Sequence, residues 1–336
     1  FRVDVAHGLA KDMDFPDLAD HVQILSSAKQ PNHAHWDRDE LHEVVREWRA
    51  VLDEYDDRMM VAEAWVSKES LPKYLRPDEY HQSFSFDLLM AAWDADAYRS
   101  TIASVYEPAK ALGAASTWVL SNHDVMRHTT RFGLPADKSW RTWPETGPAD
   151  ALDTELGERR ARVAALITLG LPGASYLYQG EELGLPEVWE LPWDVLDDPV
   201  ARRSEGTQKG RDGCRVPIPW TADGESYGFG GPAWMPQPER FAAYAADQQI
   251  GVDGSFHSLY KDALRIRREH FVDDAELTWV DAGDGVLAYS RASGVHCVAN
   301  MGAEPVPMPA GEILLTSMPG LTDELPSDTA VWLRPS

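Results

Sequence analysis

Cysteines and basic side chains are both scarce in this sequence of 336 residues. Its two cysteines, Cys214 and Cys297, are too few for a disulfide framework, and they favour a reducing compartment such as the cytoplasm. Lys and Arg total 31 against 55 Asp and Glu, which gives a net charge of −24. A surface this acidic repels phosphate backbones and anionic lipid, so we expect neither nucleic acid nor a membrane as partner.

Long hydrophobic runs are also missing. The longest uncharged stretch, residues 163–180, is interrupted by Gly170-Leu171-Pro172-Gly173. Because glycine and proline break a helix, this stretch predicts a buried helix followed by a buried strand rather than a membrane span. The chain opens with Phe1-Arg2-Val3-Asp4, in what reads as a strand, so we interpret it as the C-terminal part of a longer protein.

Hydrophobic residues make up 43% of the sequence, enough for a large core. Apolar spacing predicts helices over 38–55, where Asp37 is the expected N-cap, and over 94–112, 156–169 and 257–270. Short apolar runs predict strands at 1–5, 59–62, 83–86, 117–120 and 174–178. Strands that alternate with helices in this way are typical of a parallel α/β sheet.

The pattern changes near residue 273. Five short strands, separated by Gly, Pro and Asp, are predicted at 277–280, 285–290, 295–300, 312–316 and 329–333, with no helix between them. We therefore predict a catalytic α/β domain over residues 1–272 and a small all-β domain over residues 273–336. The stretch from 187 to 249 has little periodicity, and a loop of that length in a compact domain is usually functional.

A carboxylate follows each of three predicted strands, namely Asp4, Glu63 and Asp124. In a parallel α/β barrel all strands end on one face, where active sites lie, so these three side chains are expected to converge. Converging carboxylates suit either glycoside hydrolysis or a divalent metal site. The only histidine pair with ligand-like spacing, His33-Ala34-His35, follows no strand and is predicted to be loop, which disfavours the metal.

Other polar residues accompany these acids. Arg2 lies two residues before Asp4, on the same strand face, where its guanidinium suits an ionised nucleophile. His7 and His123 are close in sequence to Asp4 and Asp124 and can donate hydrogen bonds to substrate hydroxyls.

Five segments carry a strong family resemblance. Residues 1–8 (FRVDVAHG), 61–65 (VAEAW) and 119–124 (VLSNHD) resemble the second, third and fourth conserved regions of glycoside hydrolase family 13, the α-amylase family. Residues 173–182 resemble its strand-8 motif, and residues 211–220 (RDGCRVPIPW) resemble a loop motif of its α-glucosidase and oligo-1,6-glucosidase branch. The resemblance implies the C-terminal half of a (β/α)₈ barrel, strands 4 to 8, followed by a β-sandwich domain.

The resemblance also implies a role for each matching residue. Asp4 corresponds to the catalytic nucleophile, Glu63 to the general acid/base and Asp124 to the transition-state stabiliser.

Four further residues are implied to bind substrate. They are Arg2 and His123 at the −1 subsite, Arg215 near the +1 subsite, and His7, at a position where α-amylases bind substrate.

The expected function is hydrolysis of terminal α-glucosidic bonds in maltose- or isomaltose-type oligosaccharides, with retention and without a cofactor. A transglucosylase or a trehalose-forming isomerase of the same family is the alternative. A non-catalytic carbohydrate-binding relative is a further alternative, but all three carboxylates are present. The expected partners are a small oligosaccharide and the N-terminal half of the barrel, which also holds the calcium loop of some family members.

Overall fold

The computed structural model describes residues 1–17, 33–147, 151–271 and 275–336. They form two compact units, one from Phe1–Asp87 with Ser100–Trp118 and one from Leu88–Arg99 with Val119–Ser336. No helix among the described residues is long and apolar enough to cross a bilayer. The predicted domain boundary at 272/273 lies outside the described residues and stays a prediction.

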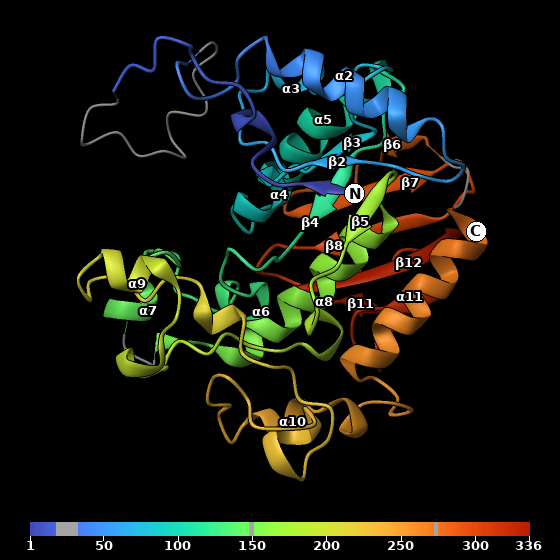
Figure 1. Ribbon diagram of the computed structural model, residues 1–336. Helices are drawn as coiled ribbons and strands as arrows, with labels where there is room; N and C mark the ends of the chain where they lie inside the picture. The colour runs from blue at the N-terminus through green and yellow to red at the C-terminus, as the bar shows by residue number, and fades with distance from the viewer. Residues whose placement is uncertain (18–32, 148–150, 272–274) are drawn as a thin grey trace. The chain divides into compact units, whose positions relative to one another are not determined.

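The first unit contains a three-stranded parallel sheet of β1 (Arg2–Val3), β2 (Val61–Ala62) and β3 (Gln82–Ser83), in that order (Figure 1). The predicted parallel arrangement is confirmed, although each strand is shorter than predicted. β1 ends early because Val5 has a φ of 47°, which an extended strand does not allow.

Helix α2 (Leu41–Leu52) supplies part of the core of this unit. Its Leu41 and Val45 pack in one cluster with Ala62 of β2 and Tyr74 of α3 (Leu71–Tyr74). The predicted N-cap at Asp37 is wrong, since the helix begins at Leu41. The Asp37 carboxylate instead accepts a hydrogen bond from the Tyr74 hydroxyl at 2.9 Å, inside the unit.

Helix α5 (Ala95–Ala111) and strand β4 (Thr117–Val119) cross the boundary between the two units. Both match predicted elements within a residue. The amide of Ala97 donates to the Asp94 carboxylate at 2.8 Å at the start of α5. The Thr117 hydroxyl donates to the Ser83 carbonyl at 2.8 Å, which ties the start of β4 to the end of β3.

The second unit is built on α8 (Thr154–Gly170) and α11 (Phe256–His270), both predicted from the sequence. Asp153 caps α8 by accepting from the Leu156 amide at 2.9 Å, and Ser255 caps α11 by accepting from Ser258 at 3.1 Å. From Val163 onward α8 is buried, and β5 (Ala174–Tyr176) follows it. This confirms the buried helix predicted within residues 163–180, whereas the strand that follows it is only partly buried, not buried as predicted.

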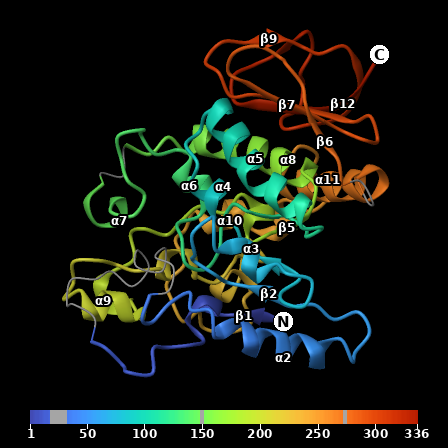
Figure 2. The same cartoon turned by 90° about the horizontal axis from the view of Figure 1, so that it is seen from above.

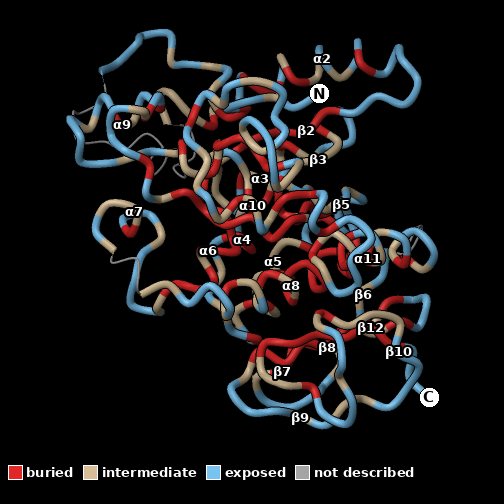
Figure 3. The backbone as a smooth tube through the Cα atoms, turned by 90° about the horizontal axis from the view of Figure 1, so that it is seen from below, coloured by how far each residue is buried: buried red, intermediate tan, exposed pale blue. Residues whose placement is uncertain are grey.

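The unit ends in antiparallel sheets. The larger has the order β10 (Gly311–Thr316), β12 (Thr329–Pro335), β8 (His296–Asn300), β7 (Val286–Arg291) and β6 (Leu277–Trp279). All five correspond to predicted strands. Two unpredicted short strands, β9 (Val306–Pro307) and β11 (Glu324–Leu325), form a second sheet, and their side chains share one core cluster with β7, β8 and β12. Figure 3 shows β7, β8 and β12 as buried.

Smaller helices and 3₁₀ turns complete the described chain. The α-helices are α4 (Asp87–Met90), α6 (His128–Arg131), α7 (Trp143–Thr146), α9 (Pro199–Arg203) and α10 (Phe241–Tyr244). The last two lie in the stretch 187–249, which otherwise contains turns and single 3₁₀ turns and has the irregular backbone expected for it.

The C-terminal sheet packs on α8, as Figure 2 shows. Side chains of the sheet donate hydrogen bonds to carbonyls near the end of this helix: Trp332 to Leu166 (3.1 Å), Tyr289 to Ile167 (2.6 Å) and Arg291 to Gly170 (2.6 Å). The last four carbonyls of a helix have no partner within it, so Tyr289 and Arg291 satisfy the carbonyls of Ile167 and Gly170. The sheet therefore stabilises the end of α8 as well as covering its side chains.

We expect Tyr289→Phe to lower the free energy of unfolding by about 1–2 kcal/mol, because it leaves a buried carbonyl without its donor. In a thermal melt this corresponds to a fall in Tm of a few degrees. Tyr55→Phe, at an exposed tyrosine, is the matched control and should leave Tm unchanged. Equal melting temperatures for the two variants would contradict the capping role of Tyr289.

A buried acid lies beyond β5. Glu181 begins a short 3₁₀ turn (Glu181–Leu183), and burial raises the pKa of its carboxyl from 4.5 to about 8. The Tyr260 hydroxyl donates to its Oε2 at 3.4 Å, whereas Oε1 has no hydrogen-bond partner among the described residues. The folded protein therefore holds a proton at neutral pH that the unfolded chain releases.

Unfolding releases this proton between pH 4.5 and 8, so Glu181 lowers stability progressively as pH rises through that window. In Glu181→Gln the side chain is always neutral. We therefore expect the free energy of unfolding of this variant, minus that of the unsubstituted protein, to be larger at pH 8 than at pH 5 by at least about 2 kcal/mol. Urea unfolding at the two pH values measures this. Glu155→Gln, at an exposed glutamate, is the control, and the same pH response in both variants would contradict the prediction.

Candidate active site

Four of the predicted site residues lie in the first unit, at the ends of β1 and β2. Arg2 pairs in register with Val61 and Val3 with Ala62, so Asp4 and Glu63 each follow directly after a paired residue. The Arg2 Nη1 lies 2.8 Å from the Asp4 Oδ1, which confirms the expected ion pair. The Asp4 side chain is 69% exposed and accessible to a ligand.

Glu63 is buried, and both of its carboxylate oxygens accept hydrogen bonds. The Val5 amide donates to Oε2 at 2.9 Å, and the Trp65 indole N–H donates to Oε1. These two donors fix the orientation of the carboxylate at the end of β2. The residue after Asp4 therefore holds the side chain of Glu63 directly.

Val5 is unusual because it is β-branched and has a φ of 47°. This conformation is rare for a branched side chain, and such strain is typical of functional sites. It turns the chain immediately after Asp4 and aims the Val5 amide at Glu63. The short 3₁₀ turn η1 (Ala6–Gly8) follows.

His7 lies in that turn and is 2% exposed. Its Nδ1 accepts a hydrogen bond from the Trp65 amide at 3.3 Å, which leaves Nε2 as the ring donor. Burial lowers the pKa of the imidazole, so the ring is neutral. His7 therefore orients the segment after Glu63, and its predicted contact with substrate stays a prediction.

The other three predicted residues lie in the second unit. Asp124 follows β4, and its Oδ1 accepts from Arg211 Nη1 at 2.7 Å and from Arg215 Nη2 at 3.1 Å. Arg215 also donates through Nε to the His123 carbonyl at 2.8 Å. The His123 Nε2 lies 3.4 Å from Asp124 Oδ2. The structure thus brings Asp124, His123 and Arg215 together.

Arg211 is also bound to a second carboxylate, that of Asp198, whose side chain is fully buried. Its Nε donates to Asp198 Oδ2 at 2.6 Å, and its Nη2 donates to Oδ1 at 3.1 Å. Burial alone raises the pKa of Asp198, but hydrogen bonds from Arg211 and the Val200 amide outweigh it and lower the pKa to about 2. Asp198 is therefore ionised at every physiological pH.

Sequence reasoning missed three of these residues. Trp65 and Arg211 lie inside the motifs 61–65 and 211–220, so the motifs already pointed to them. Asp198 had no comparable signal beyond the Asp-Pro dipeptide that opens α9. Among the described residues no cluster of His, Cys, Asp or Glu can hold a metal ion, and His33-Ala34-His35 has no regular secondary structure, as predicted.

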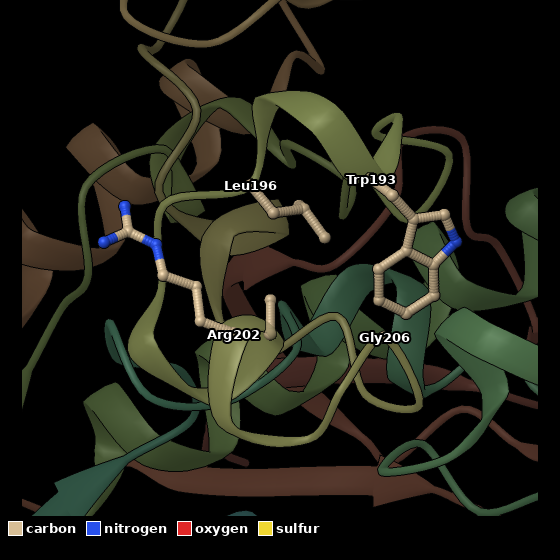
Figure 4. Close-up of a pocket in the computed structure, with 5 residues that line it drawn as sticks. Trp193, Leu196, Arg202 and Gly206 are labelled. Carbon is tan, nitrogen blue, oxygen red and sulfur yellow. The ribbon is translucent and has the colours of Figure 1, made fainter.

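An open cavity of about 280 Å³ lies on the stretch 187–249 (Figure 4). Its lining residues are Trp193, Leu196, Ala201, Arg202 and Gly206. None of the three predicted catalytic carboxylates lines it, and its only charged side chain, Arg202, pairs with Asp197 outside it. The cavity lacks the acids that glycoside chemistry needs, so the candidate catalytic residues remain those around Glu63 in the first unit and those around Asp124 in the second.

Comparison with known proteins identifies relatives. The family model for the α-amylase catalytic domain matches residues 1–274. Maltase A1 of Drosophila melanogaster is 27% identical over 292 residues, which cover 82% of this chain and 45% of the relative. A probable α-glucosidase of Rhizobium meliloti (strain 1021) is 28% identical over 275 residues, 80% of this chain and 46% of the relative. The chain spans about half the length of these relatives.

Solved structures agree with this result. Trehalulose synthase MutB from Pseudomonas mesoacidophila MX-45 superposes with a TM-score of 0.77 at 22% identity, over 99% of this chain and 64% of that one. The α-glucosyl transfer enzyme XgtA superposes with a TM-score of 0.73 at 26% identity, with the same coverage. The fold is accordingly of the α-amylase family, with a TIM-barrel-type catalytic domain and a C-terminal sheet domain, and the chain belongs to the α-amylase family.

Proposed function

We propose that this chain carries the catalytic carboxylates of a retaining α-glucosidase that cleaves terminal α-glucosidic bonds in short oligosaccharides. The observation that carries the proposal is the pairing of β1 with β2, which ends in Asp4 on one strand and Glu63 on the next. Retaining glycosidases need two carboxyl groups about 5–5.5 Å apart, and neighbouring strand ends suit that spacing. The names of the relatives, maltase and α-glucosidase, support the same substrate class.

Each proposed role follows from the environment of the residue. Asp4, accessible and paired with Arg2, attacks the anomeric carbon while Glu63 transfers a proton to the leaving oxygen. Water then attacks the glucosyl-enzyme, Glu63 takes its proton, and the bond to Asp4 breaks. Asp124 stabilises the positive charge that develops on the sugar ring. Both proposed steps use only carboxyl groups and water, so we propose that no cofactor takes part.

Four residues are proposed to bind the sugar. Arg2 and His123 contact the −1 glucose, Arg215 lies near the +1 subsite, and His7 donates through Nε2. We also propose that the chain supplies barrel strands 4 to 8 and that a further segment completes the barrel. Support comes from coverage, since the chain aligns with less than half of the curated relatives.

The alternative is transfer of glucose to another sugar instead of to water. XgtA is an α-glucosyl transfer enzyme and is 26% identical to this chain, which favours keeping this alternative. Product analysis with maltose, isomaltose, sucrose and trehalose separates the two outcomes. Free glucose as the main product supports hydrolysis, and new disaccharides at low substrate concentration support transfer.

The test of the acid/base assignment compares two substrates in the full protein. Glu63→Gln should lower kcat on maltose by about 10²–10⁴-fold. The release of dinitrophenol from a dinitrophenyl α-glucoside should fall far less in the first turnover, because this leaving group needs no proton. Asp4→Asn should abolish turnover of both substrates. Stopped-flow absorbance measures the first turnover.

Glu47→Gln, at an exposed glutamate of α2, is the matched control and should behave as the unsubstituted enzyme. Equal losses on both substrates in Glu63→Gln, measured in the first turnover, would contradict the acid role. Proton NMR of the product provides a separate check, since retention requires α-glucose to appear before the β anomer.

A further inference from the structure

The two oxygens of the Asp124 carboxylate have different surroundings. Oδ1 accepts from Arg211 at 2.7 Å and from Arg215 at 3.1 Å. Among the described residues no hydrogen bond reaches Oδ2, and the His123 Nε2 lies 3.4 Å from it. The Asp124 side chain is 33% exposed, so a ligand has access to it. Two arginines therefore hold Oδ1, whereas only the His123 ring lies near Oδ2.

Asp198 orients the Arg211 side chain that binds Asp124. Its buried carboxylate accepts from the Nε, Nη2 and backbone amide of Arg211. The guanidinium is planar, so fixing Nε and Nη2 also fixes the direction of Nη1, the atom that donates to Asp124. Asp198 itself is held in place, because its amide donates to Asp212 Oδ2 at 2.8 Å.

We infer that Asp198 is a positioning residue that acts through Arg211 on Asp124. This inference rests on the proposed function and names the residues that orient its third carboxylate. Asp198 touches no reacting atom. Its charge and its two acceptor oxygens determine where Arg211, and therefore Asp124, can lie.

This arrangement matters because Asp124 stabilises a transition state. An interaction that is realised only in the transition state affects kcat more than KM. A displacement of about 1 Å in such a group costs on the order of 10²-fold in rate. Loss of the orienting carboxylate should therefore slow the reaction while substrate binding changes little.

Asp198→Asn is the informative substitution. An asparagine oxygen still accepts from the Val200 amide and caps α9, but its NH₂ group cannot accept from Arg211. We expect kcat on 4-nitrophenyl α-glucoside to fall about 10–100-fold with KM within about threefold. Arg211→Lys should have a similar effect, because lysine keeps the charge but lacks the planar fork. Asp197→Asn, which removes only an exposed ion pair with Arg202, is the control and should keep full activity.

A second measurement is independent of turnover. Asp198 and Asp124 are linked through Arg211, so their effects on Tm should not add. We expect the Tm change of Asp124→Asn with Asp198→Asn to differ by about 2 °C or more from the sum of the two single changes. Additive changes, or an active protein whose kcat is unaffected by Asp198→Asn, would overturn the inference. A full protein, with the segment that completes the barrel, that fails to hydrolyse any α-glucoside would instead overturn the proposed function, and the melting experiment would still decide the linkage.

Discussion

The parallel pairing of β1 with β2 is the constraint on which the first unit depends. The strands are only two residues long, but backbone hydrogen bonds continue the pairing past them. The Glu63 amide donates to the Val3 carbonyl and the Ala6 amide donates to the Glu63 carbonyl, both at 2.9 Å. These bonds fix the backbone on both sides of the two carboxylates. The separation between Asp4 and Glu63 therefore depends on backbone hydrogen bonds and needs no contact between the two side chains.

In the second unit, buried charged side chains help to fix the backbone. The stretch 187–249 has little regular secondary structure, and a buried apolar cluster that includes Val188, Val216 and Phe241 orders it together with polar contacts. Arg127, almost fully buried, donates to the Gln179 carbonyl at 2.8 Å and the Cys214 carbonyl at 3.0 Å, and its amide donates to the Glu187 carboxylate at 2.9 Å. A buried charge without partners costs several kcal/mol, so each contact restricts where the loops can lie. Glycine at 213 allows this packing, because a Cβ there would lie 2.2 Å from a carboxylate oxygen of Glu187.

Much of this fold was predictable from local sequence, and the failures have physical causes. α8 and α11 were predicted within two residues because apolar spacing is a local signal, and the caps that the structure shows at Asp153 and Ser255 are local too. The short strands β9 and β11 have no period to detect. Asp37 looked like an N-cap but bonds Tyr74, a tertiary contact that local sequence does not contain. The link from Asp198 to Asp124 runs through the side chain of Arg211, so motifs indicated Asp124 and Arg211 but neither Asp198 nor the connection.

The strained backbone at Val5 shows why the nucleophile and the acid cannot be treated as independent. A left-handed conformation costs roughly 1–2 kcal/mol in an L-residue, and here a hydrogen bond from the Val5 amide to Glu63 Oε2 helps to offset it. Removing that acceptor leaves the strain uncompensated in the residue that follows Asp4. A substitution of Glu63 therefore changes the acid/base group and also the turn at Val5, which follows Asp4. Because Val5 follows Asp4 and its amide binds Glu63, the effects of substitutions at Asp4 and Glu63 on stability are not additive.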